Sequence, residues 1–187
     1  MRKSAALELA VLGLLREQPM HGYELRKRLT SMLGAFRAIS YGALYPALRA
    51  LTDSGYISQL DDPAELAEAV TTKRARITYQ ITDAGRSRFE ALLADAGPEA
   101  WDDEGFEVHF LFFAWTEAKV RRRILEGRRS RLTERQAKLS AGLRPAARQP
   151  DAYALQMQNH VLDFVENELR WIENVIAKEI EIEATAN

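Results

Sequence analysis

Several polar side chains gather at the start of one predicted helix, where their types and spacing suit contacts with nucleic acid. Ser40, Tyr41, Tyr45 and Arg49 supply hydroxyl groups, aromatic faces and one guanidinium. A hydroxyl and the unpaired N–H groups of a helix start can bind a phosphate oxygen, and a guanidinium can bind both acceptors of a guanine edge. We therefore predict that these four side chains contact DNA.

A second basic group precedes a predicted strand. Lys73, Arg74 and Arg76 could neutralise phosphates or enter the minor groove, although a basic strand tip can also be a solvated edge that resists aggregation. We favour DNA contact. Arg37 lies close to the turn between two predicted helices, and we expect it to help by contacting the phosphate backbone. We expect His21 either to help start the helix that follows it or to contact a phosphate.

The elements that would position these residues follow one another in a recognisable order. Apolar residues at helical spacing predict helices at 4–17 and 21–33 and a third beginning near Ser40, whose buried face is Leu44, Leu48 and Leu51. Alternating residues predict strands at 56–60 and 75–81, followed by a helix at 82–94. Three helices and a two-stranded wing make a winged helix-turn-helix.

Pro46 is awkward within the third helix because it lacks an N–H group and its ring clashes with the preceding turn. Either that helix begins later than Ser40, or its first turn is distorted.

The rest of the chain is predicted to be entirely helical, so the fold class is mainly α. Helices are expected at 101–115, 117–142 and 152–182, and Gly97-Pro98 suggests a boundary between them and the preceding part. We predict a DNA-binding domain at 1–96 and a helical dimerisation domain at 97–187.

The last predicted helix carries two apolar stripes. Spacings of three and four residues along one of them are typical of a coiled-coil seam, and we assign this stripe to dimerisation. A neighbouring stripe consists of Val161, Phe164, Trp171 and Val175, and two stripes predict burial on two sides, within the chain and against a partner. The stripe assigned to the dimer is Leu162, Val165, Leu169, Ile172 and Ile176.

The distribution of charge supports the assignment of DNA binding to the first domain and of dimerisation to the second. The 187-residue chain has a net charge of −1, but residues 1–90 carry 13 Lys/Arg and 10 Asp/Glu, giving +3, whereas residues 91–187 carry 13 and 17, giving −4. Affinity for DNA depends on local neutralisation of phosphates, so the basic part is the expected DNA-binding part. The basic helix at 117–142 is expected to be solvated and paired with nearby acids such as Glu126 and Asp103.

Composition also argues against several classes of site. The chain has no cysteine, which excludes disulfides, thiolate nucleophiles and cysteine-ligated zinc and fits a cytoplasmic protein. Its three histidines are far apart in sequence, and neither a Gly-rich phosphate loop nor a catalytic constellation is evident. We expect no metal, no cofactor and no enzymatic activity.

Three motifs in this order, MHGYEL, YGALYPALRALTDSGYI and YQITDAGR, resemble the PadR family of winged-helix transcriptional regulators. The similarity covers residues 4–94 closely, and the following helices resemble the larger subgroup with a helical dimerisation domain. The resemblance implies a cytoplasmic homodimer that binds double-stranded DNA through Ser40, Tyr41, Tyr45 and the wing. It further implies a repressor that a small molecule or another cue releases from a near-palindromic operator. The acidic insert at 61–70 departs from the family, whose wing is commonly shorter and more basic.

Two alternatives stay open. The aromatic segment at 101–115, with Trp101, Phe110 and Phe113, could bind an aromatic effector, but aromatic residues at helical spacing are more often core or interface. The whole protein could instead be a dimeric helical adaptor that acts through protein contacts without specific DNA binding.

Overall fold

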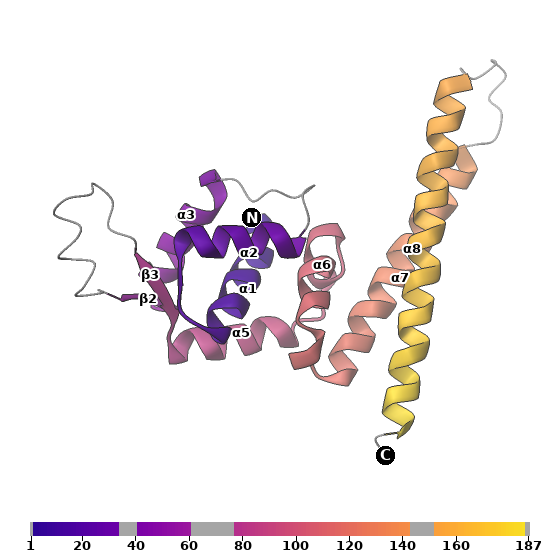
Figure 1. The fold of residues 1–187 in the computed structure, drawn as a ribbon. Helices are drawn as coiled ribbons and strands as arrows, with labels where there is room; N and C mark the ends of the chain where they lie inside the picture. Colours follow the sequence, from indigo (N-terminus) through magenta and orange to yellow (C-terminus); the bar gives the residue numbers. More distant parts are fainter. Residues whose placement is uncertain (1, 34–40, 61–76, 143–151, 186–187) are drawn as a thin grey trace. The chain divides into compact units, whose positions relative to one another are not determined.

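A computed structural model describes residues 2–33, 41–60, 77–142 and 152–185 (Figure 1). The predicted mainly helical architecture is confirmed: a winged helix-turn-helix precedes an all-helical part. The elements are α1 (Arg2–Glu17), β1 (Met20–His21), α2 (Gly22–Leu33), α3 (Tyr41–Asp53), β2 (Ile57–Leu60), β3 (Thr78–Ile81), α5 (Asp83–Ala94), η2 (Pro98–Ala100), α6 (Asp103–Leu111), η3 (Phe113–Trp115), α7 (Ala118–Gly142) and α8 (Ala152–Thr185).

The chain divides into two compact units. The first, here called the N-terminal unit, comprises Met1–Asp95 and Asp103–Thr116; the second, the hairpin unit, comprises Ala96–Asp102 and Glu117–Asn187. This division differs from a single boundary after residue 96 because α6 and η3 return to pack on α1. Among the helices of the described residues, none combines the length and apolar character that crossing a bilayer requires.

The sheet of the N-terminal unit has three antiparallel strands in the order β1-β3-β2, one more than the predicted two-stranded wing. β1 pairs with β3 through Met20 opposite Tyr79 and His21 opposite Thr78, and β2 pairs with β3 from Ile57 opposite Ile81 to Leu60 opposite Thr78. Helix α2 consequently begins at Gly22, one residue later than expected, because His21 belongs to the short strand β1.

Local chemistry fixes the turn between α3 and β2. Gly55 has a φ of +73°, the left-handed conformation that a residue without a Cβ adopts readily. The N–H groups of Gly55 and Tyr56 donate to the carbonyls of Thr52 and Leu51 at 3.0 and 2.9 Å, the pattern that ends a helix at a glycine. The predicted turn at Ser54-Gly55 is therefore confirmed.

Pro46 lies inside α3, which begins at Tyr41 and continues through it as one helix to Asp53. The helix thus starts one residue later than Ser40, and Pro46 still lies inside it rather than at its first position. The missing N–H of Pro46 leaves the carbonyl of Gly42 without the donor that a residue four positions on normally supplies.

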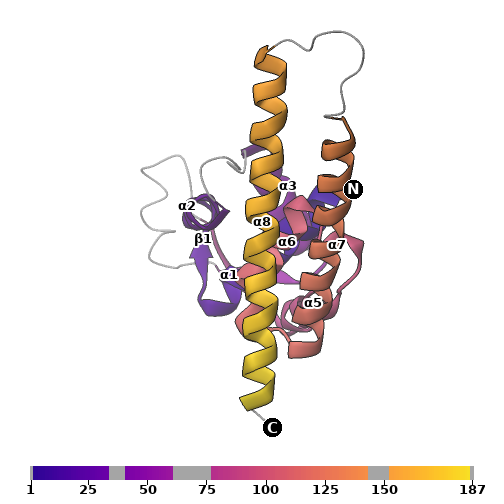
Figure 2. The ribbon, with the colours of Figure 1, turned by 90° about the vertical axis from the view of Figure 1, so that its right-hand side faces the viewer.

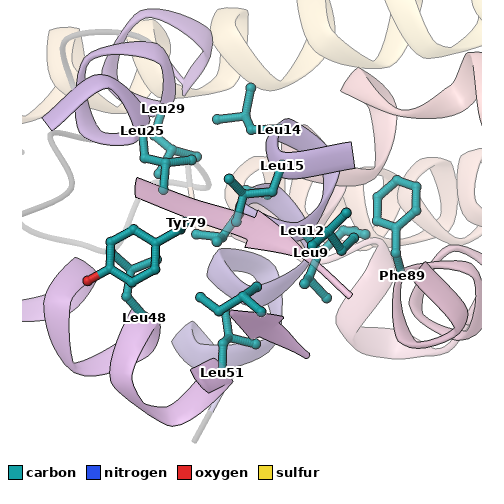
Figure 3. Packing of buried hydrophobic residues seen from close by; sticks show 14 of the residues in the cluster. Leu9, Leu12, Leu14, Leu15, Leu25, Leu29, Leu48, Leu51, Tyr79 and Phe89 are labelled. Atoms are coloured by element: carbon teal, nitrogen blue, oxygen red, sulfur yellow. The ribbon is translucent and has the colours of Figure 1, made fainter. Parts of the chain in front are cut away.

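The core of the N-terminal unit joins every main element of the winged helix (Figure 3). The predicted leucines of α3 are buried in it together with residues of α1 and α2. Phe112, which precedes η3, packs edge-on against Phe89 of α5 with 5.5 Å between ring centroids, and a Cβ at Gly13 of α1 would lie 2.2 Å from its Cζ. The segment after Asp103 therefore completes this core.

The junction between strand and α5 is equally tight. Thr82 caps α5, because its Oγ1 accepts from the N–H of Gly85 at 3.1 Å, and the same hydroxyl donates to the carbonyl of Gly55 at 2.7 Å. A Cβ at Gly85 would lie only 2.0 Å from the carbonyl oxygen of Tyr56. Glycine is thus required at this position by the approach of backbone to backbone.

The hairpin unit consists mainly of α7 and α8, which run antiparallel side by side (Figures 1 and 2). Their contact face is apolar in its centre and flanked by ion pairs between arginines of α7 and glutamates of α8. Both helices were predicted, whereas the single helix expected at 101–115 is divided into α6 and η3.

Candidate nucleic-acid interface

Helices α2 and α3 form the helix-turn-helix, and α3 has two distinct faces. Leu44, Leu48 and Leu51 are buried on one, while Tyr45 and Arg49 lie on the exposed other. Two of the predicted DNA-contacting side chains are therefore presented outward by the helix that the motif uses for recognition.

The remaining predicted contacts are described in part or not at all. Tyr41 is the first residue of α3, but its side chain is outside the described part of the structure. The other predicted contacts, Ser40, Arg37, Lys73, Arg74 and Arg76, and the acidic insert at 61–70 lie outside the described residues.

Tyr45 sits against the start of α2. Its side chain is 39% exposed, and a Cβ built on Gly22 would lie 3.3 Å from its Cε1 and 3.4 Å from its hydroxyl oxygen. The phenol edge therefore packs directly on the backbone of Gly22, and this contact joins the two helices of the motif.

Tyr79 of the central strand β3 belongs to the same neighbourhood. It is 6% exposed, and Figure 3 shows its hydroxyl pointing outward from the leucines of the core. Burial raises the pKa of the Tyr79 phenol, nearby Tyr45 raises it further, and the positive charge of Arg49 lowers it. Tyr45 and Arg49 of α3 therefore both influence the ionisation of the Tyr79 phenol.

His21 has a structural role in the described residues. Its Nδ1 lies 2.9 Å from the Thr78 hydroxyl of β3, and its backbone N–H donates to the Glu24 carboxylate at 3.0 Å. The second bond is half of a capping box at the start of α2. His21 therefore helps to start α2, as one interpretation of the sequence expected.

The base of the wing is held by side chains as well as backbone. Gln80 of β3 donates through Nε2 to the Ser58 hydroxyl of β2 at 3.0 Å. This pair lies on the ladder that carries the chain toward the predicted basic tip.

The predicted effector residues fall in different units. Phe110 and Phe113 lie in the N-terminal unit with ring centroids 4.9 Å apart, and Phe106 extends this aromatic group. Trp101 lies in the hairpin unit, where a Cβ on Gly127 would come within 2.5 Å of its ring. Phe113 is buried within its unit, and Phe110 and Trp101 are partly buried within theirs.

The stripe assigned to dimerisation is largely occupied within one chain. Val165, Ile172 and Ile176 are buried in the single chain, where α8 packs on α7, and Leu162 and Leu169 are partly buried. In the single chain this stripe therefore covers α7, and its assignment to dimerisation stays a prediction. The neighbouring stripe is the exposed one, with Phe164 62% and Trp171 42% exposed.

Three arginines of the basic helix α7 pair with glutamates that the sequence analysis did not single out. Arg121 contacts Glu179 at 2.8 Å, Arg122 contacts Glu183 at 2.9 Å, and Nε of the buried Arg128 donates to Glu168 at 2.9 Å. These glutamates all belong to α8, whereas Glu126 and Asp103 were the predicted partners. Ion pairs between two helices of a hairpin can be assigned only once it is known which residues of one helix lie opposite which residues of the other.

Gly22 is the residue of this region that sequence reasoning missed. It stands inside the motif MHGYEL, but nothing in that pattern indicates that it approaches Tyr45.

Comparisons with known proteins agree with the motifs. Residues 11–91 match the family described as transcriptional regulator PadR-like. A curated relative, the negative transcriptional regulator PadR of Bacillus subtilis, is 26% identical over 181 residues, covering 91% of this chain and 96% of that protein.

Solved structures give similar coverage. The crystal structure of Bacillus subtilis PadR with operator DNA is 22% identical, with a TM-score of 0.41, covering 92% of this chain and 98% of that one. The structure of the same protein with p-coumaric acid is 23% identical, with a TM-score of 0.41, and covers 93% and 98%. Residues 11–91 thus match the model of the PadR-like family of transcriptional regulators, the family that the motifs resemble.

Proposed function

We propose that this chain is a sequence-specific DNA-binding repressor that acts as a homodimer and is released from a near-palindromic operator by a small molecule or another cue. The observation that carries the proposal is the division of α3 into a buried leucine face and an outer face with Tyr45 and Arg49. The match of residues 11–91 to a family of transcriptional regulators supports DNA binding by this face.

The outer face of α3 has the chemistry that base and phosphate contacts need. Arg49 can donate two hydrogen bonds to O6 and N7 of guanine in the major groove, and the Tyr45 hydroxyl can bind a phosphate or a base edge. Ser40 and Tyr41 would act at the same helix start. Arg37, His21 and the wing residues Lys73, Arg74 and Arg76 would hold the backbone in register.

The exposed face of α8 supports a homodimer. Met157, Phe164 and Trp171 follow one another at seven-residue intervals and are all substantially exposed in the single chain. A second copy of α8 is the partner we propose for this seam, because the same stripe on both chains makes a two-fold contact. A two-fold dimer would read two half-sites about 34–36 Å apart, one turn of DNA, or a multiple of that distance.

Repression is supported by the name of the curated relative, a negative regulator. Bound to a promoter, a dimer would occlude it. A ligand would release the DNA only by binding better to a form whose two recognition helices are wrongly spaced. Phe110, Phe113 and Trp101 remain candidates for contacts with an aromatic effector.

The test is selection of DNA by the purified protein from a pool of random duplexes at fixed salt, with sequencing of the bound fraction. We expect enrichment of one near-palindromic sequence, affinity that falls steeply with salt, and a large preference over scrambled DNA. Arg49→Ala should weaken binding about tenfold to hundredfold and relax selectivity at one base position.

Arg123→Ala on the exposed surface of α7 is the matched control, because it removes the same charge from the hairpin unit. Binding without sequence preference, equally reduced by both variants, would contradict the proposal and favour the protein-binding adaptor.

A further inference from the structure

Gly22 forms a seat for the Tyr45 phenol. The distance of 3.3 Å from a Cβ at this position to Cε1 is shorter than ordinary van der Waals contact, and the 3.4 Å to the hydroxyl oxygen is at its lower limit, so a side chain at residue 22 would require the Tyr45 ring to move. Since Gly22 is the first residue of α2, the direction of Tyr45 on α3 depends on the backbone of the other helix of the motif.

We infer that Gly22 is a positioning residue for DNA recognition: the glycine seat fixes where the Tyr45 phenol points. This inference rests on the proposed function, because it assigns a role to a residue that is not itself proposed to contact DNA. It makes the reading of DNA depend on the junction between α2 and α3 rather than on α3 alone.

Gly22→Ala is the sharpest probe of the seat. The backbone at residue 22 does not adopt a positive φ, so alanine is allowed there, and alanine favours a helix more than glycine does. The added methyl must displace the Tyr45 ring by a few tenths of an ångström, as judged from the short distances. We therefore expect unchanged or slightly higher thermal stability together with about three- to tenfold weaker binding to the selected duplex.

The effect must disappear when the ring is absent. In a Tyr45→Ala background, Gly22→Ala should cause no further loss of affinity, because the methyl group no longer meets the phenol. An equal loss in both backgrounds would overturn the inference, since the glycine would then act by another route.

The two levels of failure can be told apart. If the wild-type chain selects no sequence, the proposed function fails. If it does and Gly22→Ala binds the selected duplex as tightly as the wild type, only the positioning role is overturned.

Discussion

The N-terminal unit and the hairpin unit bury their apolar side chains to different extents. In the N-terminal unit, residues from α1, α2, α3, the sheet, α5 and α6 meet in one core, and Phe112 closes it against Gly13. In the hairpin unit, two helices share one apolar face, while Phe164 and Trp171 on the neighbouring side of α8 stay exposed.

This contrast indicates which unit buries its apolar side chains without a partner. Several layers of structure enclose the core of the N-terminal unit, whereas the two helices of the hairpin unit have no third layer that could cover the remaining apolar stripe. The closed unit presents polar groups outward on α3, and the open unit presents aromatic and aliphatic groups on α8. DNA and a second copy of the chain are the partners that these two surfaces suit.

Phe112→Ala should have the largest effect, because it empties the centre of the closed core. We expect the free energy of unfolding of the N-terminal unit to fall by about 4 kcal/mol. Urea denaturation followed by circular dichroism measures it. Phe110→Ala, at a half-buried position of the same unit, is the control, and an equal loss there would mean that the core is not closed around Phe112.

Arg128→Ala should come next, because it leaves the Glu168 carboxylate in a largely buried place without its guanidinium. The expected loss is about 3 kcal/mol in the stability of the hairpin unit. Replacing both residues together with Met and Leu should restore most of it. If the single change also destabilised the N-terminal unit, the two units would not be independent in stability. Fluorescence of Trp115 in a Trp101→Phe/Trp171→Phe background reports unfolding of the N-terminal unit alone.

Trp171→Ala tests the open side of α8. We expect the dimer to weaken by about 2 kcal/mol, which analytical ultracentrifugation detects because monomer persists to higher protein concentration than in the wild type, without loss of stability in the N-terminal unit. Glu173→Ala, exposed on the same helix, is the control. A dimer as strong as that of the wild type would show that another surface holds the copies together.

Glu8→Gln should have the smallest effect. Arg88 of α5 donates from Nε to this carboxylate of α1 at 2.8 Å, and the bond raises the pKa of Arg88. The pair is partly solvated, so its loss should cost the N-terminal unit about 1 kcal/mol at low salt and less at high salt. A loss that salt does not change would point to packing rather than charge.

The sequence predicted the faces of helices well, because helical spacing alone determines which residues share a side. The buried side of α3, the extents of α7 and α8 and the presence of two stripes on α8 all followed from spacing. Spacing does not tell which neighbour covers a stripe, and this is why the packing of Val165, Ile172 and Ile176 on α7 was not predicted.

Features that depend on contact between distant segments could not be predicted in the same way. Strand β1 has only two residues, too few for an alternating pattern, and is defined by its pairing with β3. The return of α6 and η3 to the N-terminal unit depends on the fit of Phe112 to Gly13. For the candidate site, the outward position of Tyr45 and Arg49 was predicted. The contact of Tyr45 with Gly22 was not, because it depends on how α3 packs against α2.

The close approach at Gly85 has a consequence for genetics. A single methyl group there would collide with the main chain of Tyr56, and no rotamer change can relieve a clash with backbone. Under the proposed function, spontaneous mutants that have lost DNA binding should therefore include changes at codon 85 beside those in α3. Such mutants would differ from those in α3, because the substitution destabilises the fold and lowers the abundance of the protein. They would be recessive, and the altered residue would lie at the base of the wing and contact no base.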